Sequence, residues 1–570
     1  MKQKKKLLSL TLALAMISLT ACQGAGAPPG GAEAEVDESK TQLVVATYDG
    51  GLGDEWIFDA ASRFEEKYAS VSFEEGKKGV QVRVLKNSNF GGDAVLDTMH
   101  TEDADVWFTE TVNYQDHINY ENLADITDIV TEPLTEYGED KSIADKIEEG
   151  YRDFLNVGTD SEPQYYAIPF YDGFYGLTYD KDLFAKENLY FKSSGNEEGD
   201  SADNLDFVAS ESDTKSAGVD GKLGTYDDGL PATHAQLLQL FKKMVEKEIT
   251  PIVYGGGNAM EYLPRTLASF WAQAEGEEGY NLNNTFNGTA DNLVVLDGSG
   301  KVQKNADGSV QTESVAITVN NGYELQRQES KLQVLELFEQ IVSDENNYSS
   351  SSLQHTAAQA GFLKGKEDEF TSYGFLIDGT WWENEADESF KALASRFGEG
   401  HERAKRNLAF MPLPVATANE VGRGNCLLNL NTSLAFIRAN TDVLECAKAF
   451  LQFTTTDAEL SAFTANVSIT RSFDYELTEE YKEKVTPYAL SLYEMKNAST
   501  MIYPYSDIEI FQKNQAFFSV ERWSWQTSLA NSEYTNPWLV WLNFKNQYTA
   551  EQYFEGMHMM QKARWGTLTK

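Results

Sequence analysis

The sequence predicts an α/β protein whose strands alternate with helices. Residues 41–47, TQLVVAT, form a short β-rich run, and residues 56–68 place apolar side chains at helical spacing. Residues 80–85 alternate like a strand, residues 94–99 fit a helical turn, and residues 105–108 are strand-like again. Alternation of this kind predicts a mostly parallel sheet wrapped by helices.

Polar residues follow two of these strands. Asp49 comes directly after the first strand, in Tyr48-Asp49-Gly50-Gly51, and Glu110 and Asn113 follow the third. In open α/β sheets, ligands bind outside the carboxyl ends of the strands. These residues are therefore candidates for ligand contact.

The N-terminus reads as an export signal. Lysines 2, 4, 5 and 6 form a positive segment, and an apolar run extends from Leu7 to Ala21. The run ends in Leu19-Thr20-Ala21-Cys22, which resembles a bacterial lipobox. The resemblance implies that Cys22 becomes the mature N-terminus and carries a thioether-linked lipid, with palmitate among its acyl chains. The alternative is ordinary secretion with cleavage nearby.

Residues 22–40 are rich in Gly, Ala, Pro and Glu and have no apolar periodicity, so we expect a disordered tether. The globular body then begins near Thr41. No later segment offers eighteen consecutive apolar residues. We therefore expect a protein held by its lipid on the outer face of a cell membrane, in a Gram-positive bacterium.

Length and charge narrow the function classes. The 570 residues allow two or more domains with sizeable cores. The net charge is −42, or −46 once the four signal lysines are removed. Such a surface repels nucleic acid and anionic lipid, which makes both poor partners. It also keeps the exterior solvated, and it does not name a ligand.

Two cysteines remain besides Cys22. Cys426 precedes an apolar run, and Cys446 lies in a helical pattern. Export permits a disulfide between them, but two buried thiols fit the sequence equally well. Neither cysteine has the spacing of a metal or redox site.

Residues 165–184, YYAIPFYDGFYGLTYDKDLF, carry the most information about the fold. They read as two apolar strands broken around residues 170–172, followed by a helix that starts at Asp182. This segment resembles the interlobe crossing of family 1 extracellular solute-binding proteins, the lipoprotein receptors of ABC importers related to maltose-binding protein. Further landmarks follow in the family's order at residues 123–128, 237–254, 361–382, 408–414, 447–451 and 469–471.

The resemblance implies a type II periplasmic-binding-protein-like fold with two α/β lobes, a hinge and an interlobe ligand cleft. Lobe 1 would comprise residues 41–168 and 412–460, and lobe 2 residues 169–411 and 461–570. The chain would cross between them near 168–175, near 410–416 and around 455–475. Blocks near 186–232 and 276–325, rich in Gly, Asn, Asp and Ser, look like insertions.

The sequence does not favour an enzyme. Its six histidines include no HExxH motif and no pair at ligand spacing, and the chain has neither a GxSxG elbow nor a GxxxxGK[ST] loop. A glycosidase needs only two well-placed carboxylates, and a chain with 89 acidic residues always offers such a pair. Carboxylates alone therefore do not identify an active site.

A sugar site needs flat aromatic faces together with short polar groups. By position in the family, the resemblance implies ligand contacts from Asp49, Glu110, Asn113, Asp172, Tyr175, Trp271, Asp378, Trp381, Trp523 and Trp525. Trp381 and Trp382 are adjacent in FLIDGTWWENEA. We expect Trp381 to face ligand and Trp382 to face the core. For each tryptophan the alternative is an ordinary core position.

Residues 219–229, VDGKLGTYDDG, form a candidate calcium site. Asp220, Thr225, Asp227 and Asp228 supply hard oxygen ligands on a chain that glycines allow to bend, and Asp213 is a further candidate. The segment resembles Asp/Gly-rich bacterial calcium loops but lacks the terminal Glu of an EF-hand. The alternative is a pair of tight turns on a solvated insertion. No other cofactor is expected.

These observations favour a monomeric, lipid-anchored receptor that captures a solute and presents it to an ABC permease. The family resemblance and the supply of aromatic residues indicate a carbohydrate or oligosaccharide as the solute. Two alternatives stay open at this point. One is a surface glycan-active enzyme such as a glycosidase, and the other is a surface lipoprotein without a transport partner.

Overall fold

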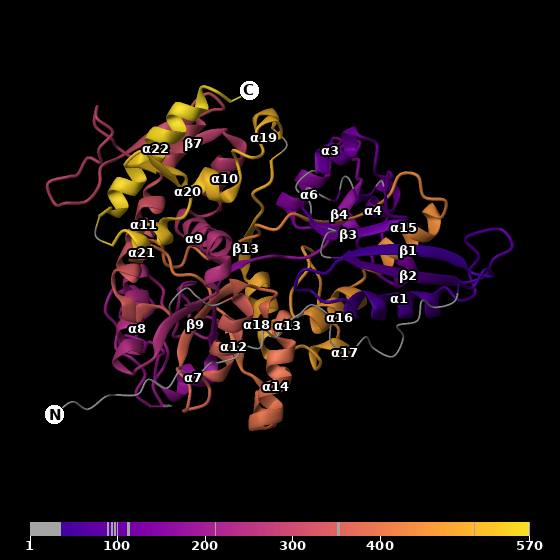
Figure 1. Ribbon diagram of the computed structural model, residues 1–570, viewed down its shortest axis with the longest axis horizontal. Coiled ribbons are helices and arrows are strands. Elements are labelled where there is room, and N and C mark those ends of the chain that lie inside the picture. The colour runs from indigo at the N-terminus through magenta and orange to yellow at the C-terminus, as the bar shows by residue number, and fades with distance from the viewer. Residues whose placement is uncertain are drawn as a thin grey trace, which may run out of the picture.

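The computed structural model describes residues 36–87, 91–92, 95, 98–99, 101–110, 114–210, 212–349, 354–506, 508–545 and 547–568. Two α/β lobes lie side by side along the long axis of the molecule (Figure 1). The signal segment, Cys22, most of the tether and Asn113 lie outside the described residues.

The first lobe is built on a five-stranded sheet of order β2-β1-β3-β12-β4. β1 pairs in parallel with β2 and β3, whereas β12 runs antiparallel to β3 and β4. The sheet is mixed: the predicted parallel pairing holds for β1, β2 and β3, whereas both pairings of β12 are antiparallel. The helical turn expected at 94–99 falls largely outside the described residues. The strands are β1 (Thr41–Tyr48), β2 (Val80–Asn87), β3 (Val106–Glu110), β4 (Ala167–Pro169) and β12 (Ser433–Ile437).

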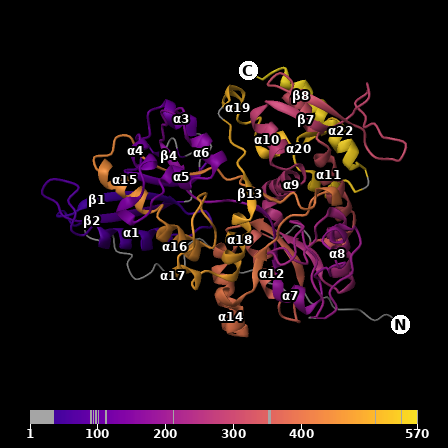
Figure 2. The same ribbon diagram turned by 180° about the vertical axis from the view of Figure 1, so that it is seen from behind.

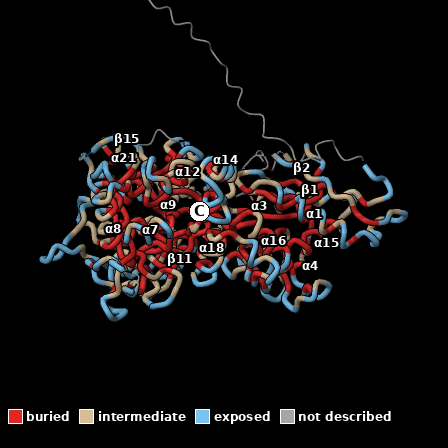
Figure 3. The backbone as a smooth tube through the Cα atoms, turned by 90° about the horizontal axis from the view of Figure 1, so that it is seen from below, coloured by how far each residue is buried: buried red, intermediate tan, exposed pale blue. Residues whose placement is uncertain are grey.

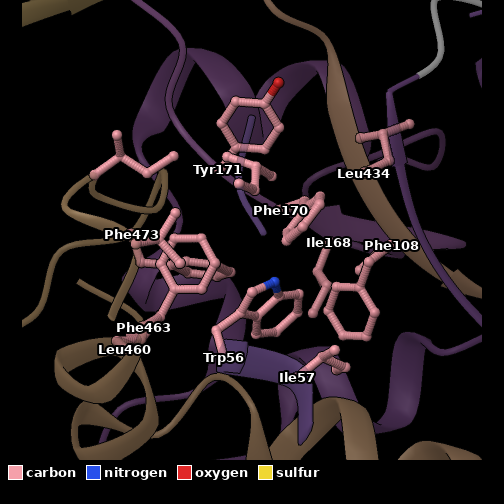
Figure 4. Close-up of a cluster of buried hydrophobic side chains, with 14 of the residues drawn as sticks. Trp56, Ile57, Phe108, Ile168, Phe170, Tyr171, Leu434, Leu460, Phe463 and Phe473 are labelled. Carbon is pink, nitrogen blue, oxygen red and sulfur yellow. The ribbon is translucent and has the colours of Figure 1, made fainter. Parts of the chain in front are cut away.

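Helix α1 (Glu55–Lys67) shows how the first lobe is packed. Its apolar side chains recur at helical spacing, so they bury one face against the sheet. The indole of Trp56 lies 5.2 Å from the ring of Phe108 and 5.1 Å from that of Phe463 (Figure 4). The other helices of this lobe are α3 (Tyr114–Asn119), α4 (Thr127–Thr131), α5 (Ile143–Lys146), α6 (Glu149–Leu155), α15 (Leu444–Phe453) and α16 (Asp457–Val467).

The second lobe is built on a four-stranded sheet of order β10-β5-β9-β6. β5 runs antiparallel to β10 and β9, and β6 runs parallel to β9. The strand break expected around residues 170–172 is present, since β4 ends at Pro169 and β5 begins at Tyr175. The helix expected after β5 is also present, and the Asp180 side chain caps its N-terminus. These elements are β5 (Tyr175–Asp180), α7 (Lys181–Lys186), β6 (Thr250–Tyr254), β9 (Tyr373–Gly379) and β10 (Leu408–Phe410).

Helices cover this second sheet. Most residues of the long helix α9 are buried, because its apolar side chains are spread around the helix and not confined to one face. The helices of this lobe are α8 (His234–Glu246), α9 (Ala259–Glu275), α10 (Glu277–Thr285), α11 (Glu329–Ser343), α12 (His355–Lys364), α13 (Trp382–Glu385), α14 (Asp387–Phe397), α18 (Pro487–Asn497), α19 (Glu509–Lys513), α20 (Val520–Trp525), α21 (Pro537–Asn543) and α22 (Ala550–Trp565). The short helix α17 (Glu479–Lys482) packs on α16 of the first lobe.

Three two-stranded pairs complete the strands. β7 (Gly288–Val294) and β8 (Thr312–Ile317) form an antiparallel hairpin within the segment expected to be an insertion. β11 (Asn425–Leu428) runs parallel to β13 (Ser499–Ile502), and β14 (Thr527–Leu529) pairs with β15 (Ser532–Tyr534). In the described part of the expected insertion at 186–232, a short 3₁₀ turn, Glu198–Ser201, follows the end of α7.

The chain passes between the sheets three times. It leaves the first sheet after β4 and enters the second at β5, and it returns between β11 and β12. It passes again between α16, which packs on α1, and α18, which packs on β10. Both views place α18 and β13 near the middle of the molecule (Figure 1, Figure 2).

The return passage lies later in the chain than the predicted 410–416. The backbone N–H of Met411 donates to the carbonyl of Leu177, and Val415 bridges to Thr233, so this stretch still belongs to the second sheet's surroundings. Both 408–414 and 426–428 are apolar runs, and their composition does not tell which one leads into the crossing. The exact division of the chain into lobes remains a prediction.

Each lobe has a buried core, drawn in red in Figure 3. Cys426 and Cys446 are free, buried thiols rather than a disulfide pair. Burial raises the pKa of the Cys446 thiol to about 12. Among the described residues, no helix is both long and apolar enough to cross a membrane.

Candidate ligand-binding site

Two adjacent tryptophans follow β9 and point to different surroundings. Trp382 is fully buried, and its ring packs 5.9 Å from Phe362 and 5.7 Å from Tyr488. Trp381 keeps 7% of its surface exposed. Gly379 permits this turn, because a Cβ added there would lie 2.2 Å from the Trp381 indole. The strand end therefore sets one ring into the core and brings the other toward the first lobe.

The indole of Trp381 contacts two aromatic rings of the second lobe and the backbone of the first lobe. Its centroid lies 5.2 Å from Tyr175 and 6.1 Å from Tyr262, and both rings stand edge-on to it. From the first lobe, Gly51 approaches so closely that an added Cβ would lie 2.7 Å from Trp381 Cδ1. The side-chain amide of Asn384 donates to the Gly51 carbonyl at 3.2 Å. The loop after β1 and the loop after β9 are thus in contact.

A carboxylate from the end of β3 lies beside this contact. Glu110 accepts hydrogen bonds from the hydroxyl of Tyr171 and, at 3.4 Å, from the amide of Asn431. Burial raises the pKa of Glu110 to about 7, against the opposing charge of Arg265 and with the like charge of Glu261. Glu110 is therefore a partly buried acid whose charge depends on how the lobes enclose it.

Arg265 on α9 supplies a positive charge to the same region. Its Nη1 donates to the Tyr175 hydroxyl at 2.6 Å and to Glu261 at 2.7 Å, and its Nε lies 3.4 Å from Glu521. The Tyr175 hydroxyl in turn donates to Asn431 Oδ1 at 3.4 Å. Indole, phenol, carboxylate, amide and guanidinium groups from both sheets thus converge between the lobes.

A second pair of carboxylates lies at the end of β9. One amide nitrogen of Gln359 donates to Asp378 at 3.0 Å and to Glu385 at 2.7 Å. Asp378 is 2% exposed, and burial together with the nearby charge of Glu385 raises its pKa to about 8. His355 Nε2 lies 3.3 Å from Glu385. As placed, Asp378 braces the strand end by accepting from Gly379 N–H at 2.8 Å.

Comparison with known proteins identifies the family of this chain. The model of the bacterial extracellular solute-binding protein family matches residues 123–460, more than half of the chain. The chain belongs to this family. No curated protein matches the sequence. The predicted two-lobed α/β fold of these solute-binding proteins is confirmed.

Solved structures agree with this assignment of the fold. RafE from Streptococcus pneumoniae in its apo form has 12% identity and a TM-score of 0.52, over 92% of this chain and 98% of that chain. The GacH receptor of Streptomyces glaucescens has 12% identity and a TM-score of 0.50, over 93% and 100%. The cyclic alpha-maltosyl-1,6-maltose binding protein of Arthrobacter globiformis has 11% identity and a TM-score of 0.50, over 93% and 100%.

Of the residues expected to contact ligand, Glu110, Tyr175 and Trp381 lie together between the lobes of this solute-binding protein. Asp49 lies exposed in the loop after β1. Asp378 lies buried behind the same strand end. Asn113 lies outside the described residues.

The other expected contacts lie elsewhere. Trp271 and Trp525 have no exposed surface and pack 6.1 Å apart in the core of the second lobe. Trp523 belongs to an aromatic cluster in which its ring lies 5.6 Å from Trp565. Asp172 is 1% exposed and lies inside the hinge, where its two oxygens accept hydrogen bonds from the protein itself. As placed, Trp271, Trp525 and Asp172 offer no surface to a ligand, and Trp523, 5% exposed, is packed within its aromatic cluster.

The candidate calcium segment of the solute-binding protein is closed by its own hydrogen bonds. Asp227 accepts from Thr225 Oγ1 at 2.7 Å and from Asp220 N–H at 2.9 Å, and Asp228 accepts from Gly224 N–H at 2.8 Å. Asp213 pairs with Lys192 instead. Burial raises the pKa of Asp227 to about 6. Within the described ranges, no three acidic, histidine or cysteine side chains are grouped to hold a metal.

Sequence reasoning missed three residues of the site, namely Tyr262, Arg265 and Asn431. Glu261 and Arg265 stand four apart on the helix after the Gly-rich turn, which is a pairing signal that a sequence shows. Asn431 lies in the polar stretch Asn429-Leu-Asn-Thr432 between two apolar runs. Their partners, however, lie far away along the chain, so their role appears only in the fold.

Proposed function

We propose that this protein is the extracellular substrate receptor of an ABC importer and that it captures a carbohydrate, an oligosaccharide, between its lobes. The observation that carries the proposal is the position of Trp381. Its indole lies at the interlobe contact, beside Tyr175 and Tyr262. The Tyr175 hydroxyl is hydrogen-bonded to Arg265 and Asn431, and Asn431 is hydrogen-bonded to Glu110.

The chemistry of these groups suits a sugar. An indole face covers the apolar side of a pyranose ring, which is a flat array of C–H groups. Carboxylate, amide and guanidinium groups pair with the hydroxyls, and each buried hydroxyl requires such a partner. Neutral hydroxyls both donate and accept, so a site that offers both donors and acceptors fits them.

The structural neighbours support the same ligand class. The GacH receptor is described in complex with acarbose and an acarbose homolog, and the Arthrobacter protein as a binding protein for cyclic alpha-maltosyl-1,6-maltose. At 11–12% identity these proteins share the fold only, so the carbohydrate assignment for this chain rests on the aromatic and polar groups at its own interlobe contact.

Capture follows from two lobes that can close on a ligand. A ligand that contacts both lobes binds the closed state better than the open one, and it shifts the population by that difference in affinity. The closed receptor then presents the ligand to a membrane permease. Lipidation at Cys22 and the tether to residue 40 would keep the receptor at the membrane; the lipobox-like sequence supports this part of the proposal.

A thermal-shift screen tests the ligand class. Neutral tri- and tetrasaccharides of several linkages are compared with amino acids and short peptides, each at the same concentration. A ligand at 100 times its dissociation constant stabilises the folded protein by about 2.7 kcal/mol. We expect a rise in melting temperature with at least one oligosaccharide. A rise with peptides alone would contradict the carbohydrate assignment.

A further inference from the structure

A buried carboxylate stands where the three interlobe passages meet. Asp172 lies on the first passage, between β4 and β5. Its Oδ2 accepts from Thr470 Oγ1 at 2.7 Å, and its Oδ1 accepts from Ser472 Oγ at 2.5 Å, both on the third passage. Its Oδ1 also accepts from Asn429 Nδ2 at 3.2 Å, on the second passage. One side chain thus joins all three passages.

A lysine of the second lobe completes this cluster. Lys496, on α18, is 3% exposed, and its Nζ lies 3.5 Å from Asp172 Oδ2. The same Nζ donates to the carbonyls of Arg471 and Phe473 at 2.7 and 2.8 Å. Lys496 Nζ also lies 3.4 Å from Glu148 Oε1, so Glu148 and Asp172 together offset its buried charge. The three passages are therefore held together by buried, hydrogen-bonded groups at this position.

The cluster continues into the interlobe site through two asparagines. Asn429 Oδ1 accepts from the backbone N–H groups of Gly173 and Asn431, each at 3.2 Å. Asn431 Nδ2 donates to Glu110 at 3.4 Å, and Asn431 Oδ1 accepts from the Tyr175 hydroxyl at 3.4 Å. A continuous hydrogen-bonded path therefore runs from Asp172 to groups of both lobes at the site.

The backbone around Asn431 is packed too closely to move on its own. A Cβ added at Gly173 would lie 2.6 Å from Asn431 Cγ, and the Tyr505 hydroxyl donates to the Asn431 carbonyl at 2.9 Å. Asn429 and Asn431 are 0% and 9% exposed. Because each group is held from several sides, a change of lobe angle at the passages has to move Asn431 relative to Glu110 or Tyr175.

We propose that Asp172 and Asn429 are positioning residues that couple the hinge to the interlobe site through Asn431. The hinge cluster holds the three passages together so that the lobes turn as two bodies, and Asn431 carries that geometry to Glu110 and Tyr175. The inference builds on the proposed capture between the lobes, but it concerns the unliganded protein and can be tested without a ligand.

The test measures the distance between the lobes. Spin labels are attached to Ser70→Cys in the first lobe and Ser343→Cys in the second, both exposed positions, in the full chain with Cys22→Ser. The two native thiols are buried and do not compete for label. Pulsed electron–electron double resonance then gives the distribution of distances between the two labels. For the parent protein we expect one narrow distribution.

Asp172→Asn is the diagnostic variant, and Asp200→Asn is its matched control. Asp200 is equally buried, at 2% exposed, and accepts from backbone N–H groups of Ser194 and Ala217, remote from the hinge. Both variants should lower the melting temperature. Only Asp172→Asn should broaden the interlobe distribution and lengthen its mean by several ångströms. Equal distributions in the two variants would overturn the proposal.

A second variant covers the case in which Asp172→Asn does not fold. Gly173→Ala leaves the hinge carboxylate intact but forces Asn431 to move. It should also broaden the distribution, and an unchanged distribution would refute the coupling. Oligosaccharide added to the same labelled protein separates the two proposals: a hinge effect without any response to sugar contradicts the ligand class and leaves the coupling standing.

Discussion

At the scale of single residues, the two tryptophans after β9 divide their roles. Trp382 packs among Phe362 and Tyr488 with no exposed surface, whereas Trp381 reaches the loop after β1 in the other lobe. Their side chains are identical and adjacent, so a comparison between them separates the effect of ligand contact from that of core packing.

Replacing Trp381 with Ala should weaken oligosaccharide binding by about 2 kcal/mol, or about thirtyfold, because the indole face would no longer cover the sugar. Trp382→Phe is the control: it should lower the melting temperature and leave the affinity unchanged, since its ring lies in the core. Calorimetric titration measures both. If the affinity survives Trp381→Ala, this ring is not the platform.

Glu110 should make the unliganded protein respond to pH. Burial raises the pKa of Glu110 from 4.5 to about 7, so the enclosed state holds the proton more tightly than a solvated carboxyl does. Its contribution to closure is complete below pH 4.5 and is lost as the pH rises toward 7. The radius of gyration from X-ray scattering should therefore increase between pH 5 and 8.

Glu110→Gln is the control for this pH response. The amide has no proton to lose, so the radius should no longer depend on pH in this interval. An equal pH dependence in the variant would assign the response to another group.

At the scale of elements, the strands were predictable because each shows its own apolar pattern. The runs that became β1, β2, β3 and β5 all lie where the pattern places them. The crossing between β11 and β12 was not predictable, because either of two apolar runs in this part of the chain could lead into it. Periodicity reports which face of an element is apolar, and it does not report which sheet that face joins.

The site was predictable where it follows a strand end. Glu110 is the last residue of β3, Trp381 follows β9 by two residues, and both lie at the interlobe contact, as expected for polar and aromatic groups at strand ends. Trp271 and Trp525 lie on helices, where an aromatic ring has the same spacing in a core and in a cleft. Arg265 and Asn431 meet Tyr175 from 90 and 256 residues away, and no local pattern encodes such a meeting.

The loop after β1 depends on glycine at position 51. Gly51 has φ +81°, and an added Cβ would lie 2.7 Å from the Trp381 ring. Gly51→Ala should therefore lower ligand affinity at least tenfold, because the lobes can no longer meet there. The cost of alanine in this left-handed conformation adds about 1–2 kcal/mol of instability.

Gly76→Ala is the matched control for that instability. Gly76 has φ +84° in the same lobe, and an added Cβ would meet nothing within 4 Å. It should lose stability by a similar amount and keep its affinity. Calorimetric titration measures the affinity of both variants, and thermal denaturation measures their stability. Equal affinities in Gly51→Ala and Gly76→Ala would show that the lobes do not close on Gly51.

At the scale of the whole molecule, the proposed function gives the two lobes, the tether and the lipid separate tasks. The lobes would form the site, and lipidation at Cys22 would attach it to the membrane. With a net charge of −46 once the four signal lysines are removed, the chain has no electrostatic attraction to an anionic lipid surface. We therefore expect attachment to depend on the acyl chains.

Cys22→Ser should release the protein from cells. Cells grown with labelled palmitate should incorporate label into the parent protein and into a Cys426→Ser control, whose thiol is buried in the fold. The Cys22→Ser variant should carry no label and appear in the medium. Label that persists in Cys22→Ser would place the lipid elsewhere.

The central claim is that an oligosaccharide binds between the lobes and leaves unaltered. Isothermal titration with an oligosaccharide identified by the thermal-shift screen, followed by mass spectrometry of the recovered sugar, tests it most directly. We predict one sugar bound per protein chain and a recovered sugar of unchanged mass and linkage. A shortened sugar would show an enzyme, and failure of every oligosaccharide to bind while another solute binds would contradict the account.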